Sequence, residues 1–472
     1  MAKPLTPDLC VIGTGSGGLW VAAAGAALGV PVVLIEKHRM GGECLNTGCV
    51  PSKALLAAAK RAAAVRTAGS FGILADGLRV DFAKVHAHVH AVIAAIAPND
   101  SEARFTGLGV HVIKGAAHFR DRRTVLVGDT EIRARRFVVA TGSAPAIPPI
   151  PGLATTPHLT NENVFDLQHC PTQLIVIGGG PIGLELAQAF CRLGSAVTVL
   201  EAALPLAKED SECAAAVLDQ LTRDGVKIRP STRIARVAAA GCGVEVVLDD
   251  GETIAGSHLL VATGRQPNVA GLGLDQAGIR HSGRGIETDK RLLTTNSRVY
   301  AIGDVVAGAP QFTHLASYHA GLVVRNALFR LPVRLDYSAI PRVTFTEPEL
   351  AHVGRSEEQV RAQGGAFRVL RWPYHENDRA QAERETRGHI KVLTNGRGKI
   401  LGATIVGAHA GELITPWTLA ITHGLNIRAL AGLVAPYPTY GEINKRAASS
   451  YFASSLTSPL LRCIIRFLRG FG

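Results

Sequence analysis

The 472-residue sequence has no apolar run long enough to cross a bilayer, because Gly25, Gly29 and Pro31 interrupt its most apolar stretch, residues 21–35. The N-terminal residues show neither a basic stretch nor a signal-cleavage pattern. The sequence also lacks a basic patch interleaved with aromatic residues, so its net charge of +12 does not indicate nucleic-acid binding. These absences predict a cytoplasmic protein with no nucleic-acid partner.

Six of the eight cysteines do not have the spacing of metal ligands. They are scattered and are expected to be small buried or partly buried thiols in a reducing compartment: Cys10, Cys170, Cys191, Cys213, Cys242 and Cys463. No metal site is predicted from the sequence.

The other two cysteines, Cys44 and Cys49, lie in the segment GGECLNTGCVPSKAL. In a regular helix their Cα atoms would be about 8 Å apart, too far for a disulfide, so a bond between them requires a bend around residues 46–48. Pro51 suits the first turn of a helix running from about residue 52 to residue 66. Cys49 would lie just ahead of that helix, where the macrodipole favours a thiolate. The segment therefore predicts a reversible disulfide with one activated sulfur.

A glycine-rich pattern occurs twice. Each copy has a strand, G-x-G-x-x-G, a helix, a second strand and an acidic residue, and the interval from the first glycine to the acid is the same in both. Glycines permit close approach to a pyrophosphate, and the acid suits a ribose hydroxyl pair. The copies consist of Gly13, Gly15, Gly18 and Glu36, and of Gly178, Gly180, Gly183 and Glu201. Two dinucleotide sites are predicted.

These motifs, in this order, resemble the pyridine nucleotide-disulfide oxidoreductases, the family that includes dihydrolipoamide dehydrogenase, glutathione reductase and mercuric reductase. The resemblance covers nearly the whole chain. It implies an α/β fold with two Rossmann-like domains, one for FAD and one for NAD, and a C-terminal α+β dimerisation domain that forms a homodimer. The implied boundaries are 1–149 and 273–336 for the FAD domain, 150–272 for the NAD domain and 337–472 for the dimerisation domain.

The resemblance assigns the first glycine motif to FAD and the second to the nicotinamide nucleotide. It adds FAD-binding residues at Lys53, Gly115, Ala117, Thr141, Gly142, Ser143, Gly303 and Asp304, and Gly264 on the NAD side. Lys53 is expected to lie by the flavin and to pair with Glu185. Glu201 would repel a 2′-phosphate, and no arginine follows it closely, so NADH is expected over NADPH.

The C-terminal part departs from the family pattern. Disulfide reductases of this family have a histidine–glutamate pair that acts as acid and base, and here the histidine position is Tyr437 while Glu442 matches the glutamate. A phenol with a pKa near about 10 is a poor proton shuttle at neutral pH. Tyr437 could instead donate a hydrogen bond, ligate a metal or act as an acid of lowered pKa. Mercuric reductases also have a tyrosine there, followed by a C-terminal cysteine pair that this chain lacks.

Three functions follow. The first is NADH oxidation through FAD and a Cys44–Cys49 disulfide, with Cys49 on the flavin side and Cys44 exchanging with a lipoyl-type or other disulfide. The second is reduction of a soft metal ion held by the two thiolates and Tyr437, and the third is a redox-sensing or binding flavoprotein with slow turnover. The terminal segment 458–472 is basic and amphipathic, so weak membrane contact or packing on a partner is also expected.

Overall fold

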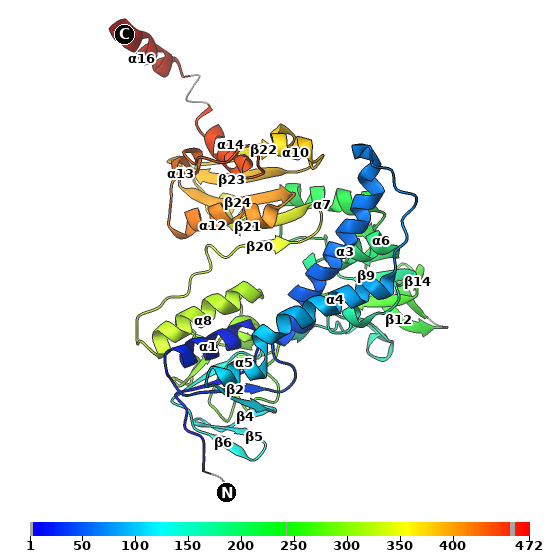
Figure 1. The fold of residues 1–472 in the computed structure, drawn as a ribbon, viewed down its shortest axis with the longest axis vertical. Coiled ribbons are helices and arrows are strands. Elements are labelled where there is room, and N and C mark those ends of the chain that lie inside the picture. The colour runs from blue at the N-terminus through cyan, green and yellow to red at the C-terminus, as the bar shows by residue number, and fades with distance from the viewer. Residues whose placement is uncertain (1–2, 242, 454–457) are drawn as a thin grey trace. The chain divides into compact units, whose positions relative to one another are not determined.

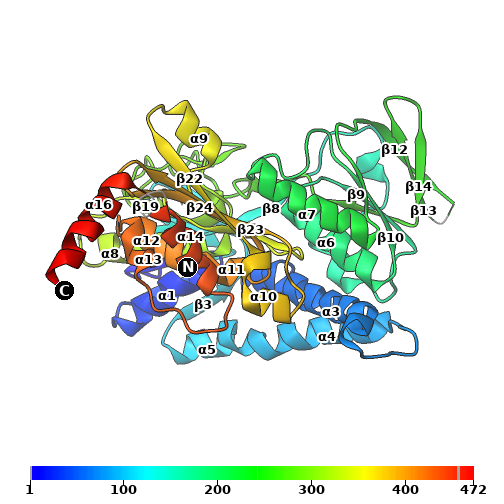
Figure 2. The same ribbon diagram turned by 90° about the horizontal axis from the view of Figure 1, so that it is seen from above.

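The structure is a computed structural model that describes residues 3–241, 243–453 and 458–472, so Cys242 lies outside the described residues. The chain divides into two compact units. One comprises residues 1–178, 189–200 and 232–335, and the other comprises residues 179–188, 201–231 and 336–472. Figures 1 and 2 show the ribbon in two views.

The first unit is built on a five-stranded parallel sheet in the order β19-β7-β1-β2-β3. Its strands are β1 (Leu9–Ile12), β2 (Val32–Glu36), β3 (His111–Lys114), β7 (Arg136–Val139) and β19 (Val299–Ala301). The near-continuous apolar runs suit strands that are buried on both faces. Figure 1 shows α1 (Ser16–Ala27) and α8 (Thr313–Ala327) side by side.

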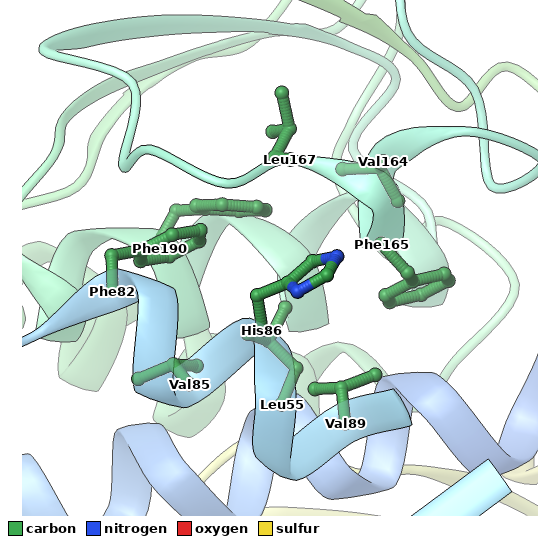
Figure 3. A pocket seen from close by; sticks show the side chains of 9 residues that line it. All are labelled: Leu55, Phe82, Val85, His86, Val89, Val164, Phe165, Leu167 and Phe190. Carbon is green, nitrogen blue, oxygen red and sulfur yellow. The ribbon is translucent and has the colours of Figure 1, made fainter. Parts of the chain in front are cut away.

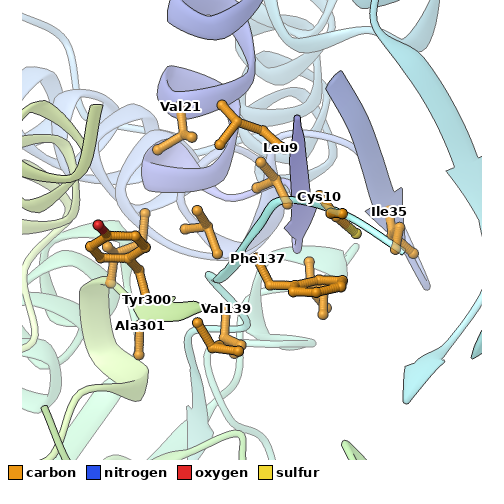
Figure 4. Close-up of a cluster of buried hydrophobic side chains, with 14 of the residues drawn as sticks. Leu9, Cys10, Val21, Ile35, Phe137, Val139, Tyr300 and Ala301 are labelled. Atoms are coloured by element: carbon orange, nitrogen blue, oxygen red, sulfur yellow. The ribbon is translucent and has the colours of Figure 1, made fainter. Parts of the chain in front are cut away.

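A buried cluster joins this sheet to α1, and Figure 4 shows it from close by. Its labelled side chains come from β1, α1, β2, β7 and β19: Leu9, Cys10, Val21, Ile35, Phe137, Val139, Tyr300 and Ala301. Strand β19 is far along the chain from β7 but pairs with it directly. The last part of this unit therefore completes the sheet that begins near the N-terminus, while the predicted domain boundaries remain a prediction.

The same unit contains a second parallel set, β10 (Ala196–Leu200), β9 (Gln173–Ile177) and β15 (His258–Val261). Two antiparallel sheets of three strands accompany the parallel ones. They are β4 (Ala117–Asp121), β5 (Thr124–Val127) and β6 (Thr130–Ile132), and β12 (Ile234–Ala240), β13 (Gly243–Leu248) and β14 (Thr253–Gly256). A two-stranded ribbon joins β8 (Ser143–Pro145) to β16 (Arg265–Pro267).

The other helices of this unit are α2 (Gly42–Asn46), α3 (Cys49–Thr67), α4 (Phe82–Ile96) and α5 (Glu102–Gly107). Helices α3 and α4 pack against each other, and a small apolar pocket lies beside them (Figure 3). The Phe82 and Phe190 rings are stacked there with centroids 6.1 Å apart, and the His86 ring is directed into the pocket. We assign this pocket to packing that fixes α3, the helix that begins at Cys49.

The second unit contains a five-stranded antiparallel sheet in the order β20-β21-β24-β23-β22. The strands are β20 (Arg342–Thr344), β21 (Glu349–Gly354), β22 (Phe367–Pro373), β23 (His389–Asn395) and β24 (Ile400–Gly407). Trp417 of α12 is fully buried, and its Nε1 donates to Asn444 Oδ1 of α14 at 2.7 Å. This hydrogen bond connects α12 and α14 within the core of the second unit.

Helices of this unit include α7 (Ser211–Asp224), α9 (Glu357–Ala362), α10 (Asp378–Ala382), α11 (Ala410–Leu413), α12 (Thr415–Thr422), α13 (Ile427–Ala431), α14 (Glu442–Ser450) and α16 (Pro459–Leu468). Helix α6 (Pro181–Leu193) runs from the second unit into the first. Among the described residues, no helix combines the length and apolar character needed to cross a membrane.

Candidate active site

The first glycine motif forms the turn between β1 and α1. Gly13 has φ +106°, and a Cβ there would lie 2.4 Å from the carbonyl oxygen of Ala140, so only glycine fits. At Gly15, immediately before α1, a Cβ would meet no atom within 4 Å. The backbone is therefore open where the helix N-terminus begins, which is the place a pyrophosphate would take.

Glu36 at the end of β2 is held beside this turn. Its Oε2 accepts hydrogen bonds from the Thr14 N–H at 3.0 Å and from Thr14 Oγ1 at 2.6 Å. Its Oε1 accepts from the His38 N–H at 2.7 Å. The carboxylate thus has a fixed orientation next to the open backbone.

The second motif repeats this arrangement. Gly178 has φ +114°, and a Cβ there would lie 2.4 Å from the Ala262 carbonyl oxygen, whereas a Cβ at Gly180 would meet nothing within 4 Å. Glu201 Oε2 accepts from the Gly179 N–H at 2.6 Å, and Oε1 accepts from the Ala203 N–H at 2.8 Å. Each oxygen keeps a lone pair for a ribose hydroxyl. Both glycine-rich turns therefore fit the pyrophosphate and ribose of a dinucleotide.

The predicted FAD residues between the two motifs lie around the first one. The Gly115 N–H donates to the Glu36 carbonyl at 2.8 Å, which brings the segment before Ala117 next to the acid. Thr141 Oγ1 donates to the carbonyl of Asn268 at 2.9 Å, and Gly142 follows with φ +68°.

Two of the residues predicted to bind FAD contact each other. Ser143 Oγ donates to Asp304 Oδ2 at 2.6 Å. The preceding Gly303 donates its N–H to His319 Nδ1 at 3.1 Å. Burial lowers the pKa of His319 to about 4, so a neutral imidazole accepts this bond. On the NAD side, Gly264 has φ +139° and directly precedes β16, and Gly183 lies in the first turns of α6.

The predicted bend in the cysteine segment is confirmed. Cys44 lies in α2, which ends at Asn46, and α3 begins at Cys49. The helix was expected to start near Ser52, and that boundary was wrong: the Ser52 N–H already donates to the Gly48 carbonyl, which places Cys49 in the first turn. Proline at the third helical position costs no hydrogen bond, so the helix extends back to the cysteine.

Cys44 and Cys49 are hydrogen-bonded to each other through their side chains. This bond, together with burial, raises the pKa of Cys44, so Cys44 keeps its proton and donates it to the Cys49 sulfur. Cys49 is exposed, and its Sγ lies 3.2 Å from Thr313 Oγ1 at the start of α8. Thr313 was missed by the sequence analysis because no motif marks it. The N-termini of α3 and α8 both lie at Cys49, which favours negative charge on that sulfur.

Lys53 and Glu185 belong to different units. Lys53 follows Cys49 by one turn of α3. Glu185 is buried in α6, and its Oε1 accepts from the Phe345 N–H at 2.9 Å. The Lys53–Glu185 ion pair would join the two units and stays a prediction.

Tyr437 is 70% exposed and lies on the loop before α14. Its hydroxyl donates to Asp378 Oδ2 at 2.8 Å, and this bond raises the pKa of the phenol, with a smaller contribution from the charge of Glu442. Of the three roles considered for Tyr437, the contact with Asp378 favours hydrogen-bond donation over an acid of lowered pKa, because it raises the pKa of the phenol. Glu442 is the first residue of α14.

Two repeated dinucleotide-binding turns and a dithiol at a helix N-terminus define an oxidoreductase that passes electrons between a nucleotide and sulfur. The chain belongs to the pyridine nucleotide-disulphide oxidoreductase family: residues 7–320 match its model, and residues 340–448 match the model of its dimerisation domain. The family uses FAD and NAD(P)H, and the dimerisation domain supports a homodimer.

Relatives include a mercuric reductase of Streptomyces lividans, 36% identical over 94% of this chain and 96% of its own length. A dihydrolipoyl dehydrogenase of Staphylococcus aureus is 35% identical with the same two coverages. Among solved structures, the Cu(II) complex of the HOCl-induced flavoprotein disulfide reductase RclA from Escherichia coli has a TM-score of 0.86 at 30% identity, covering 93% of this chain and 99% of its own. The chain is thus an FAD-dependent pyridine nucleotide-disulfide oxidoreductase.

Proposed function

We propose that this enzyme transfers electrons from NADH through FAD to a Cys44–Cys49 disulfide and then to a disulfide acceptor of the lipoyl type. The open turn at Gly15 and the fixed Glu36 carboxylate would hold FAD, which when bound would supply hydride acceptance from NADH and electron-pair transfer to the disulfide. Reduction of the disulfide to a protonated Cys44 and a Cys49 thiolate takes two electrons and one proton, which together equal the hydride that NADH gives up. The observation that carries the proposal is the Cys49 sulfur in the first turn of α3, with the protonated Cys44 thiol hydrogen-bonded to it. We propose Cys44 as the sulfur that exchanges with substrate.

A panel of acceptors tests this proposal. The purified holoenzyme is mixed with NADH and with lipoamide, with other small disulfides or with thiophilic metal salts, and NADH oxidation is followed. Turnover with disulfides supports the proposal. If only the metal salts support NADH oxidation, the enzyme is a metal-ion reductase instead. No acceptor-dependent turnover would favour a redox sensor.

A metal-ion reductase is the second candidate, because Tyr437 replaces the histidine that disulfide exchange uses. A relative named mercuric reductase and a solved Cu(II) complex of a family member also favour it. In the described part of the chain, no three or more His, Cys, Asp or Glu side chains form a resident metal site. A soft ion would therefore arrive as substrate and bind the two active-site sulfurs.

Replacing Tyr437 by histidine is expected to raise the rate of lipoamide reduction by about tenfold or more, because imidazole titrates near neutral pH and general acid–base catalysis contributes about 100-fold or more in favourable cases. Steady-state kinetics of the two proteins measures this. The control Tyr437→Phe removes only the phenolic hydroxyl and should change the rate of lipoamide reduction little. A wild type that already reduces lipoamide faster than Tyr437→His would show that the phenol serves as the acid.

NADH is expected to exceed NADPH in kcat/KM by about tenfold or more, because one repelled charge at Glu201 is worth on the order of 1–3 kcal/mol. Glu201→Ala should remove the preference and leave the FAD content unchanged. The Glu201 N–H donates to the Arg229 carbonyl at 3.0 Å, so an arginine lies beside the acid that the sequence analysis did not consider. The variant Arg229→Gln shows separately whether Arg229 raises kcat/KM for NADPH. Equal efficiency with both nucleotides in the wild type would place Glu201 away from the ribose.

We also propose that the C-terminal tail makes weak contact with an anionic membrane. Every residue from 459 to 472 is exposed, and the dimerisation-domain model ends at residue 448. Helix α16 carries Arg462 and Arg466, and Arg469 follows it. The apolar side chains Leu461, Ile464, Ile465 and Leu468 lie mainly on the other face. Three arginines contribute roughly 1 kcal/mol each near such a surface, which gives salt-sensitive binding.

Deleting residues 458–472 is therefore expected to abolish co-flotation with anionic vesicles at low salt, with NADH-dependent flavin reduction retained. A variant with Arg462, Arg466 and Arg469 all changed to glutamine keeps the apolar side chains and should also lose binding. If the full-length protein floats no better than either variant, the tail packs on protein instead. A cytoplasmic location remains part of the proposal and is tested by cell fractionation.

A further inference from the structure

Arg265, the first residue of β16, lies at the centre of a polar network beside the redox thiols. Its side chain is only 13% exposed. Nη1 donates to Glu43 Oε1 at 2.5 Å, and Nη2 donates to Glu43 Oε2 and to the Ser143 carbonyl. Nε donates to Ser143 Oγ at 2.8 Å and lies 3.5 Å from Asp304 Oδ2. The guanidinium therefore contacts three groups from distant parts of the sequence.

Glu43, the partner of Arg265, directly precedes Cys44 in α2. Its carbonyl accepts the Thr47 N–H at 2.8 Å, and its Oε1 accepts from Asn161 Nδ2 at 2.8 Å. Asn161 Nδ2 also donates to the Thr47 carbonyl at 3.2 Å. The bend between the two cysteines is thus fixed through the side chain and backbone of Glu43.

The charge of Glu43 is costly in this position. Burial raises the pKa of the carboxyl, Arg265 opposes that rise, and the charges of Asp304 and Cys49 add to it. A bidentate arginine neutralises a carboxylate with fixed geometry. Without Arg265, an uncompensated negative charge would remain next to the thiol pair and would disfavour a second negative charge on Cys49.

We propose that Arg265 is a positioning residue that ties the cysteine loop to the Ser143–Asp304 pair and, by neutralising Glu43, maintains Cys49 as a thiolate. The inference rests on the proposed function. The charge of Asp100 before α5 raises the pKa of Cys44 and the Thr313 hydroxyl of α8 lowers it. The charge of Asp304 acts on Glu43, and Lys53 follows Cys49 by one turn of α3. Arg265 contacts both Glu43 and the Ser143–Asp304 pair.

The test uses the reduced holoenzyme and two readouts as functions of pH. The first is the long-wavelength charge-transfer absorbance expected between the Cys49 thiolate and the oxidised flavin, which Cys49→Ser should abolish. The second is the rate at which iodoacetamide alkylates Cys49. In Arg265→Gln, the pH midpoint of both should rise by about one unit, a tenfold change in proton concentration. In Glu43→Gln the midpoint should fall, because the arginine loses its counter-charge. The double variant Glu43→Gln/Arg265→Gln should return close to the wild-type midpoint.

The matched control is Arg280→Gln, an arginine that is 73% exposed and paired with Glu287, and it should leave both readouts unchanged. The proposal is overturned if Arg265→Gln leaves the midpoint unchanged or if the double variant keeps the single variant's shift. If Arg265→Gln does not fold, the fall expected in Glu43→Gln still decides the question. If the wild type shows no long-wavelength absorbance, the proposed function fails, and the alkylation rates still test the role of Arg265.

Discussion

Serine in place of Cys49 is expected to lower acceptor-dependent NADH oxidation by at least about a thousandfold, because Cys49, at the N-terminus of α3, is the sulfur that we propose on the flavin side and Cys44 cannot form the proposed disulfide without it. The variant should also lose the long-wavelength absorbance of the two-electron-reduced enzyme. FAD content should stay the same, since the dinucleotide turn is intact. Anaerobic spectra and steady-state rates measure both effects.

The companion variant Cys44→Ser separates the two sulfurs. It should keep the Cys49 thiolate and its absorbance, yet lose turnover, because the exchanging sulfur is gone. Cys463→Ser is the matched control, since this thiol is also exposed but lies in α16, outside the site. A Cys49→Ser enzyme with near wild-type turnover would show that electrons pass from the flavin to the acceptor without the disulfide.

The variant Gly15→Val is expected to lower FAD affinity by about a hundredfold or more while the apoprotein folds normally. Gly15 has φ −69° and ψ 177°, which valine adopts without strain, and a Cβ there meets no protein atom. The side chain would occupy the space that we assign to the pyrophosphate. Fluorescence titration of the apoprotein with FAD measures the affinity, and thermal unfolding of the apoprotein checks the fold.

Gly180→Val makes the same change in the second copy, where the glycine is equally open. It should retain FAD and raise KM for NADH by about tenfold or more. The two variants thus assign one nucleotide to each turn. If Gly15→Val retained full FAD affinity, or if Gly180→Val lost FAD, the assignment of the first turn to FAD would be wrong.

The parts predicted correctly from sequence are those in which a short motif determines its own geometry. The turns at Gly13 and Gly178 need positive φ and close backbone contact, and both requirements are visible as glycines in the sequence. The bend between Cys44 and Cys49 follows from the distance that a disulfide allows. The hydrogen bonds of Glu36 and Glu201 repeat because the spacing from turn to acid repeats.

The parts that sequence reasoning missed depend on residues far apart in the chain. Thr313 is 264 positions from Cys49, and Arg265 is 222 positions from Glu43. Only the pairing of β16 with β8 and the packing of α8 on α1 bring these side chains to the cysteine loop. The partner of Tyr437 was missed for the same reason, because Asp378 lies in α10, 59 positions away in the chain.

The most direct test of the account is an anaerobic titration of the FAD-loaded enzyme with NADH, combined with counting of accessible thiols. With one equivalent of NADH per FAD, the account predicts that Cys44 and Cys49 become titratable thiols, that the flavin spectrum remains mainly oxidised and that the long-wavelength absorbance appears. Loss of the oxidised flavin spectrum without any new thiol would contradict the account, because the electrons would then stop at the flavin.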